Sequence, residues 1–158
     1  MISVLFVCLG NICRSPMADG VFQQMVNEAG LSNLIKVDSA GTGGWHRGEP
    51  AHQGTRNVLK LHGINYSGSA RLFTREDVDS FDYILAMDSS NLSDIGRIAG
   101  RSQEAEIRLF LAYANDAGLT DVKDVPDPFY DDKFDEVYEL VAIGCRALFD
   151  HIRHEHEI

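Results

Sequence analysis

The sequence predicts an α/β protein with a parallel sheet covered by helices on both faces, and three observations support this fold class. Segments typical of strands alternate with segments typical of helices along the chain. The strand segments include continuous apolar runs, as in residues 4–7, which are typical of strands buried on both faces. The helical segments carry apolar residues at helical spacing. Strands that alternate with helices form right-handed crossovers and therefore a parallel sheet.

The expected elements follow from these patterns and from capping residues. The expected strands are residues 1–7, 34–39, 83–87 and 106–111. Five helices are expected. The first begins at the N-cap residue Ser15, the second covers residues 55–62, and the third follows the N-cap residue Thr74. The fourth runs from Ser89 or Ser90 to Ile98, and the fifth covers residues 134–152. Ligands of such sheets bind beyond the carboxyl ends of the strands, so the segment after residues 1–7 is the first candidate site.

The length of 158 residues is typical of one domain, and we expect residues 1–158 to form a single domain. No apolar run approaches the ~20 residues of a membrane span, and Met1 leads directly into a strand rather than a secretory signal. The cysteines, Cys8, Cys13 and Cys145, are odd in number and do not suggest a disulfide framework. We therefore expect a cytoplasmic protein with no membrane partner.

The charge balance is acidic, with 24 acidic residues, 14 basic residues and a formal net charge of -10. This balance argues against nucleic acid as a partner, because binding to a phosphate backbone needs a basic surface. It also opposes the approach of a phosphorylated substrate. The basic residues near the candidate site, Arg14, His46, Arg47 and Arg71, would offset this field locally, so we expect the association rate to depend on ionic strength.

The segment between the first strand and the first helix combines a nucleophile with an anion site. Cys8 follows the strand and Ser15 opens the helix, so the helix points its amino end back at the thiol. A helix amino end and a tight loop present N–H groups to an anion such as phosphate. Gly10 and Asn11 suit the left-handed conformation of such a loop, and Arg14 supplies a planar fork for two phosphate oxygens. The same positive field favours the thiolate of Cys8.

This segment resembles a known family. Cys8 and Arg14 with five residues between them, followed by Ser15, resemble the phosphate loop of cysteine-dependent tyrosine phosphatases. Residues 7–16 are similar to the low-molecular-weight protein tyrosine phosphatase family in particular. The alternative, that Cys8 packs as a small hydrophobic residue at a strand end, leaves Gly10, Asn11 and Arg14 unexplained.

The resemblance implies a four-stranded parallel sheet and the hydrolysis of phosphotyrosine through a cysteinyl-phosphate intermediate, with Cys8 as the nucleophile. It implies a phosphotyrosine-containing protein as substrate, with phosphate, vanadate or sulfate as anions at the site. No metal and no cofactor are expected, because arginine and amide groups neutralise the charge. The residues expected to bind the substrate along the loop are Leu9, Gly10, Asn11, Ile12, Cys13 and Ser15.

Asp127 is the candidate general acid. It lies between Pro126 and Pro128 in a stiff loop, and a carboxylic acid held in a desolvated loop can protonate a leaving phenolate. Taken alone, an Asp-Pro pair is more typical of a turn, but with the phosphate loop it resembles the general-acid loop of the family. Asp131, Asp132 and Asp135 lack the glycine and glutamate of a calcium loop, so a solvated helix start is expected there.

Aromatic side chains are expected to wall the pocket. Trp45 lies in a glycine-rich loop that matches no nucleotide fingerprint, and the resemblance implies that Trp45 and Tyr130 flank the substrate ring. It also implies that Ser39 hydrogen-bonds Asn11 and that His62 supports the loop from behind. Phe129 departs from relatives that have two adjacent tyrosines at this place.

Other functions remain open. Arsenate reduction on the same fold would need further cysteines after the third strand, and residues 83–91 contain none. A non-catalytic phosphate-binding module would ordinarily lack the nucleophile or the acid. An arginine phosphatase is expected to have threonine in place of Ile12.

Two further groups of residues suggest separate predictions. Cys13 is a candidate to form a disulfide with an oxidised Cys8. The terminal histidines His151, His154 and His156 are expected to belong to a frayed tail rather than a metal site.

Overall fold

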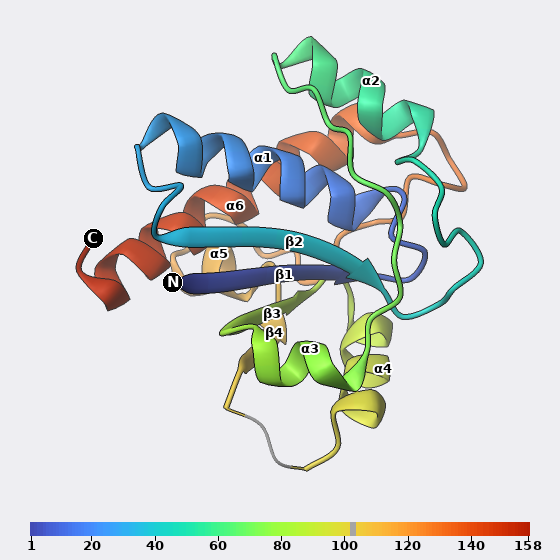
Figure 1. The fold of residues 1–158 in the computed structure, drawn as a ribbon. Coiled ribbons are helices and arrows are strands. Elements are labelled where there is room, and N and C mark those ends of the chain that lie inside the picture. Colours follow the sequence, from blue (N-terminus) through green and yellow to red (C-terminus); the bar gives the residue numbers. More distant parts are fainter. Residues whose placement is uncertain (102–103) are drawn as a thin grey trace.

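The computed structural model describes residues 1–101 and 104–158 and contains one parallel sheet of four strands (Figure 1). The strand order is β2-β1-β3-β4, so β1 has a partner on each side. Every pair of neighbouring strands is parallel. The strands are β1 (Ile2–Cys8), β2 (Ile35–Gly41), β3 (Tyr83–Ala86) and β4 (Glu106–Leu109). The predicted fold class is confirmed, and the strand ends differ from the predicted ones by at most two residues.

Helices cover both faces of this sheet (Figure 1). On one face, α1 packs on β1 and β2 and against α6, with α2 and α5 beside these helices. On the other face, α4 packs on β3 and β4, and α3 contacts α4. The helices are α1 (Arg14–Glu28), α2 (Gln53–Leu61), α3 (Arg75–Ser80), α4 (Ser89–Ala99), α5 (Ala112–Asp116) and α6 (Phe134–His156).

The central strand β1 contributes to the core on both faces. Val4 and Phe6 belong to the core that includes α1 and α6, whereas Leu5 and Val7 belong to the core on the opposite face. Side chains alternate in direction along a strand, so a strand buried on both faces needs an apolar residue at every position. Cys8 continues the first set, and its side chain therefore faces α1.

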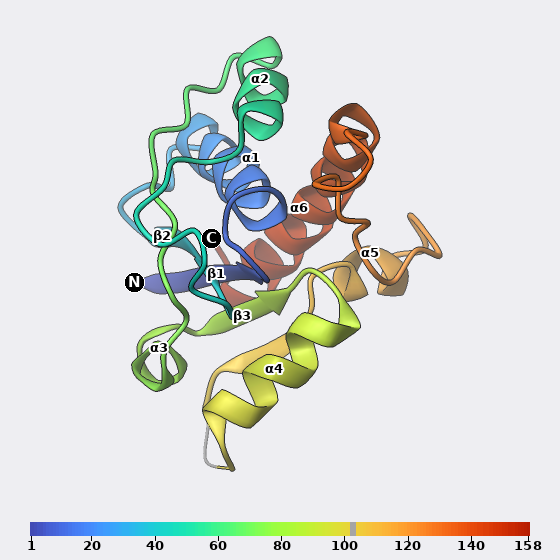
Figure 2. The ribbon, with the colours of Figure 1, turned by 90° about the vertical axis from the view of Figure 1, so that its right-hand side faces the viewer.

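The strand order determines where a ligand can bind. From β1 the chain crosses to β2 on one side, whereas β3 and β4 lie on the other side. In open parallel sheets, ligands bind beyond the carboxyl ends of the strands at such a change of direction. Figure 2 looks onto these ends, where the loop between β1 and α1 lies in front of the sheet. Cys8 at the end of β1 and Asp88 after β3 share this edge.

The start of α1 differs from the prediction. The helix begins at Arg14 with Cys13 as its N-cap residue, so the prediction that Ser15 is the cap is wrong. The Ser15 hydroxyl is unavailable for capping because it contacts the Cys8 sulfur and accepts a hydrogen bond from the Asn11 side chain. The residue that looks like a helix signal in the sequence is therefore part of the candidate site.

The segments after β3 and β4 add two features that the sequence does not predict. The helix α4 begins at Ser89, one of the two predicted starts, and its N-cap residue is Asp88, whose carboxylate accepts a hydrogen bond of 2.8 Å from the Asn91 N–H. The short helix α5 is not predicted at all. It has only five residues and no capping side chain, so the sequence carries little signal for it.

The carboxyl-terminal helix α6 extends beyond the predicted end at residue 152 to His156. The His156 Nε2 lies 2.9 Å from the Tyr83 hydroxyl, and the His151 ring packs 4.8 Å from the Tyr113 ring. The prediction of a frayed tail is therefore wrong, because contacts with the body of the protein hold this end. Within residues 1–101 and 104–158, no three His, Cys, Asp or Glu side chains gather as a metal site.

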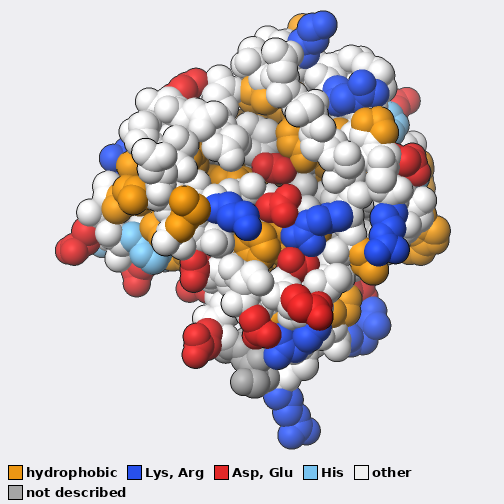
Figure 3. Space-filling view, viewed as in Figure 1, with side chains coloured by type: hydrophobic (Ala, Val, Ile, Leu, Met, Phe, Trp, Pro, Cys, Tyr) orange, Lys and Arg blue, Asp and Glu red, His pale blue; other side chains and the backbone are white. Residues whose placement is uncertain are grey.

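The surface shown in Figure 3 mixes charges of both signs. Lys and Arg side chains are interspersed with Asp and Glu side chains, and no continuous basic area covers this face. A phosphate backbone needs such an area, so this face does not suit nucleic acid. In the described part of the chain, no helix is both long enough and apolar enough to cross a bilayer.

Candidate active site

The loop between β1 and α1 forms the floor of a cavity, and we use "floor" for residues 8–15. The carbonyl oxygens of Leu9 and Ile12 accept hydrogen bonds of 2.8 and 2.7 Å from backbone N–H groups of neighbouring segments. The N–H groups of residues 10–13 have no acceptor among the described residues. A loop with paired carbonyls and unpaired N–H groups at a helix amino end suits an anion.

Two residues give the floor its tight shape. Asn11 has a φ of 57°, which is the predicted left-handed conformation. Gly10 does not adopt this conformation, so that part of the prediction is wrong. Gly10 instead leaves room for a neighbouring side chain, because a Cβ at this position would lie 3.0 Å from Cδ2 of His46, which is a tight contact.

The side chain of Asn11 is fully engaged. Its Nδ2 donates to the Ser15 Oγ at 2.8 Å and to the Ser39 Oγ at 3.0 Å, as expected for Ser39. Its Oδ1 accepts from the Arg71 N–H at 2.9 Å. The Ser15 Oγ lies 3.0 Å from the Cys8 sulfur. Because Ser15 accepts from Asn11, its own proton has two acceptors, the Cys8 sulfur and, at the longer distance of 3.5 Å, the Ala40 carbonyl oxygen. The shorter contact places the hydroxyl to stabilise a thiolate on Cys8.

Tyr66, rather than His62, supports this network from behind. The Tyr66 hydroxyl lies 3.4 Å from the Ser39 Oγ and donates to the Asp19 carboxylate at 2.8 Å. Burial raises the pKa of Asp19 to about 6, although the hydrogen bond from Tyr66 partly opposes the rise. The prediction for His62 needs correction, because its side chain caps the end of α2 by bonding the Val58 carbonyl and stacks on a tyrosine ring of α6.

The Arg14 side chain is buried, and contacts with neighbouring segments fix the orientation of its guanidinium. Its Nη1 donates to the Asp88 carboxylate at 2.6 Å and to the Val125 carbonyl at 2.9 Å, and its Nη2 lies 3.7 Å from Asp127. Burial lowers the pKa of Arg14, but the neighbouring Cys8 and the carboxylates of Asp88 and Asp127 outweigh it and raise the pKa overall. The guanidinium therefore stays charged at the floor.

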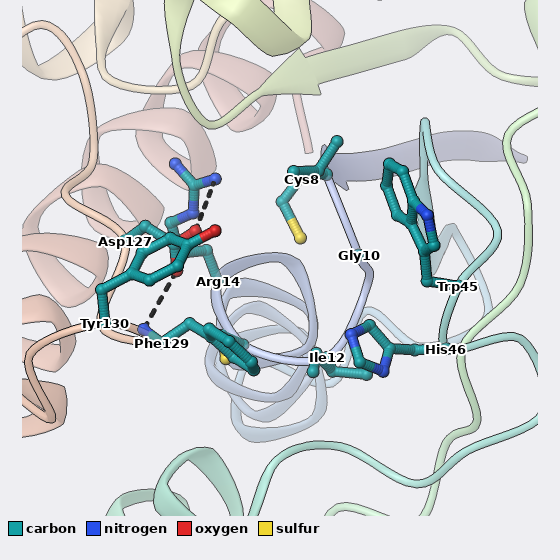
Figure 4. A pocket seen from close by; sticks show the side chains of 11 residues that line it. Cys8, Gly10, Ile12, Arg14, Trp45, His46, Asp127, Phe129 and Tyr130 are labelled. Carbon is teal, nitrogen blue, oxygen red and sulfur yellow. Dashed lines mark hydrogen bonds and ion pairs between the residues drawn. The ribbon is translucent and has the colours of Figure 1, made fainter.

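The cavity above the floor has a volume of about 250 Å³ (Figure 4). Its lining brings together nine of the predicted site residues and adds two others. It is lined by Cys8, Leu9, Gly10, Ile12, Cys13, Arg14, Trp45, His46, Asp127, Phe129 and Tyr130. The other two residues predicted to bind the substrate, Asn11 and Ser15, do not line the cavity and lie behind it. The predicted supporting residues Ser39 and His62 do not line it either. The predicted site is thus split into a lining and a supporting layer.

The rim of the cavity, which we define as Trp45, His46, Phe129 and Tyr130, contrasts with the floor. Trp45 and Tyr130 are 72% and 80% exposed. The Trp45 ring packs over Gly43, where a Cβ would overlap it at 1.8 Å. An exposed aromatic ring suits contact with a planar ligand group.

Cys13 is a free, buried thiol at the amino end of α1. Burial, with smaller contributions from Cys8 and Asp127, raises its pKa to about 12. Cys13 is therefore a neutral thiol at physiological pH, in contrast to the role expected of Cys8.

Asp88, which binds Arg14, is a residue of the candidate site that the sequence does not predict. The available signal was its position directly after a buried strand, at the same sheet edge as Cys8. In the sequence, His46 is a basic residue near the candidate site and Phe129 is a departure from relatives with two adjacent tyrosines. The structure brings both into the cavity lining.

A thiol at the end of a central strand, an anion-binding loop and a buried arginine define the class of cysteine-dependent phosphatases. The family model described as low molecular weight phosphotyrosine protein phosphatase matches residues 3–157. The chain belongs to this family, whose enzymes are cysteine-dependent and need no metal ion.

Individual relatives are similar to this chain over nearly its full length. The low molecular weight protein-tyrosine-phosphatase YfkJ of Bacillus subtilis is 46% identical, with 100% of both chains covered. PtpA of Staphylococcus epidermidis, with the same enzyme name, is 45% identical over 96% of this chain and 94% of its own. The crystal structure of YfkJ matches with a TM-score of 0.93, at 47% identity over 98% of this chain and 96% of that one.

A further solved structure widens the range of relatives. DARP, a Drosophila arginine phosphatase, matches with a TM-score of 0.87 at 30% identity, over 97% of this chain and 98% of its own. The fold is therefore shared by enzymes named for different phosphorylated residues, and the substrate must be argued from the site.

Proposed function

We propose that this protein hydrolyses phosphotyrosine in proteins through a cysteinyl-phosphate intermediate, with residues 1–158 as one catalytic domain. The main supporting observation is that Cys8, Arg14 and Asp127 line one cavity at the carboxyl edge of the sheet. The names of its relatives support the same activity.

In the first step, the Cys8 thiolate attacks phosphorus. A sulfur–phosphorus bond forms while the bond between phosphorus and the phenolic oxygen breaks. Asp127 donates its proton to the leaving phenolate. Arg14 and the unpaired N–H groups of the floor stabilise the charge on the remaining phosphate oxygens, and no metal ion is needed for this.

In the second step, water attacks the phosphorus of the intermediate. The Asp127 carboxylate accepts a proton from this water, an oxygen–phosphorus bond forms and the sulfur–phosphorus bond breaks. Inorganic phosphate leaves and the thiolate of Cys8 is restored. The Ser15 hydroxyl, 3.0 Å from the sulfur, stabilises this thiolate as a leaving group.

The walls of the cavity support an aromatic substrate. Ile12 is an apolar residue at the floor, and Trp45 and Tyr130 present rings at the rim. A phenyl ring is suited to contact with these surfaces. Phosphate, vanadate and sulfate should bind at the floor as anions. The cytoplasmic location expected from the sequence stays a prediction.

Two alternatives predict different chemistry at the same floor. On this fold an arsenate reductase would need further resolving cysteines after the third strand, but residues 83–91 contain none, and Cys145 is completely buried in α6. A non-catalytic module would bind phosphate without turnover.

Turnover of p-nitrophenyl phosphate, measured with EDTA, with vanadate and with arsenate side by side, tests all three functions. We expect turnover that EDTA leaves unchanged and vanadate inhibits. Reduction of arsenate with a thiol donor would favour the reductase, and phosphate binding without turnover would favour the module.

A further inference from the structure

Phe129 connects the two sides of the cavity. Its ring centroid lies 6.2 Å from that of His46 and 5.9 Å from that of His52, in the second case edge to face. His46 lies in the segment after β2, and His52 is the N-cap residue of α2. Contacts of this kind between rings are favourable and depend on geometry. Figure 4 shows Phe129 and His46 on either side of Ile12.

The two histidines are themselves fixed relative to the floor. The backbone N–H of His52 donates to the Ile12 carbonyl at 2.7 Å. The ring of His46 packs against Gly10 so closely that a Cβ there would meet its Cδ2 at 3.0 Å. The ring of Phe129 therefore packs against side chains whose positions follow the phosphate-binding loop.

The backbone of Phe129 in turn holds Asp127. The Phe129 N–H donates to Oδ1 of Asp127 at 3.1 Å, while Oδ2 lies 3.7 Å from Nη2 of Arg14 (Figure 4). Only Pro128 separates the two residues, and its ring restricts the backbone between them. Because the ring and this N–H belong to the same residue, the packing of the ring restricts how far the N–H and the carboxyl group bound to it can move.

We propose that Phe129 is a positioning residue for Asp127, and that its packing against His46 and His52 keeps the acid where it protonates the leaving phenolate. This proposal rests on the proposed function, because it requires Asp127 to be the general acid. The simpler role is an apolar wall for the substrate ring. A wall stabilises all aryl phosphates alike, whereas a positioning residue matters most when the leaving group needs a proton.

The test is the dependence of kcat/KM on the pKa of the leaving phenol, measured over a series of aryl phosphates. Phe129→Ala should lose about tenfold on phenyl phosphate and less than about twofold on p-nitrophenyl phosphate, because misplacement of the acid matters only for the poor leaving group. Phe129→Tyr keeps the ring and should keep the wild-type slope. His46→Ala, which removes one contact of the ring, should change the slope in the same direction.

Tyr130→Ala is the matched control, because Tyr130 is the adjacent exposed aromatic residue of the rim. It should lower kcat/KM by the same factor across the series. Adding Phe129→Ala to Asp127→Ala should cause no further change of slope, since the acid is already absent.

Two results would overturn the proposal and leave Phe129 as a wall. One is a loss of kcat/KM in Phe129→Ala that is the same for all aryl phosphates. The other is a steeper dependence on leaving-group pKa in the double variant than in Asp127→Ala alone. If Asp127→Ala alone left the slope unchanged, the general-acid part of the proposed function would fail, and the role of Phe129 would fail with it. The single and double variants therefore separate the two failures.

Discussion

The floor and the rim of the cavity are built by different means. Cys8, Asn11 and Arg14 at the floor are at most 3% exposed. Hydrogen bonds with β2, with the segment before α3 and with the segment after β3 hold Asn11 and Arg14. At the rim, Trp45 and Tyr130 are 72% and 80% exposed and are held by packing. Donors that are aligned in advance stabilise a transition state without reorganisation. The floor is therefore suited to chemistry and the rim to recognition.

The largest effect should come from breaking the floor at its nucleophile. Cys8→Ser should reduce turnover of p-nitrophenyl phosphate to below about a hundredth of wild type, because a serine hydroxyl is not ionised at neutral pH. Vanadate should still bind, since the N–H groups and Arg14 remain. Fluorescence of Trp45, the only tryptophan, measures this binding at the rim. Residual turnover above a hundredth would move the nucleophile to another residue.

Asp127→Ala removes the proton donor above an intact floor. It should lower kcat/KM on phenyl phosphate by about a hundredfold or more and on p-nitrophenyl phosphate by much less. Asp131→Ala, at an exposed carboxylate four residues away, is the control and should change either rate by less than about twofold. An equal loss on both substrates would contradict the assignment of Asp127 as general acid.

Ile12 belongs to the floor but contacts the space enclosed by the rim, so it should influence which phosphorylated residue is preferred. An alkyl side chain cannot accept a hydrogen bond from a guanidinium, and an unpaired polar group costs about 1–3 kcal/mol. We expect a preference for phosphotyrosine over phosphoarginine peptides that Ile12→Thr weakens by roughly tenfold to a hundredfold. Ile12→Val is the matched apolar control. An unchanged ratio of kcat/KM in the threonine variant would remove Ile12 from the account of specificity.

Asp19 extends the floor network at some cost in stability. Its folded pKa of about 6 lies above the ordinary 3.8, so it stabilises the fold fully below pH 3.8 and loses that contribution as the pH rises through about 6. Asp19→Asn should therefore raise the free energy of unfolding at pH 8 by about 2 kcal/mol and have little effect at pH 4. Urea unfolding at both pH values measures this difference.

The exposed carboxylate Asp121 provides the control for this measurement, and Asp121→Asn should leave the free energy of unfolding unchanged at both pH 4 and pH 8. A gain for Asp19→Asn that is equal at pH 4 and pH 8 would show that the charge of Asp19 is not its cause.

The smallest effect concerns Cys13. Cys13→Ser should leave turnover within about twofold of wild type. After peroxide treatment, however, dithiothreitol should restore less activity than in wild type, because Cys13 would otherwise capture a sulfenic acid on Cys8 as a disulfide. The raised pKa of Cys13 predicts that this capture is faster at higher pH. Equal recovery of both proteins, or no Cys8–Cys13 linkage by mass spectrometry, would exclude a protective role.

Much of the fold and the floor could be predicted because local patterns determine them. A run of apolar residues identifies β1, and the spacing between Cys8 and Arg14 identifies the loop that follows it. The residues from distant segments that hydrogen-bond the floor could not be predicted in this way. Asp88 reaches Arg14 across 74 positions of the chain, and no local pattern distinguishes it from an ordinary helix cap.

The error for His62 has the same origin. His62 and Tyr66 are close in sequence, and which of them reaches Ser39 depends on where α2 ends. Similarly, the hydroxyl of Ser15 could bind the helix amino end or the site, and only the tertiary structure decides between them. Sequence patterns identify the residue types of this site better than they assign its supporting contacts.

The alignment of Arg14 has a consequence for inhibitor design. Asp88 and Val125 occupy one side of its guanidinium, and the other donors and the N–H groups of residues 10–13 remain available to a ligand. A neutral compound would leave these donors desolvated and unpaired, so tight binding at the floor favours anionic groups. Anionic groups enter lipid poorly and bind every phosphatase that has a similar loop. A selective, cell-permeable inhibitor must therefore draw its affinity from the rim, above all from the aromatic surface of Trp45 and Phe129.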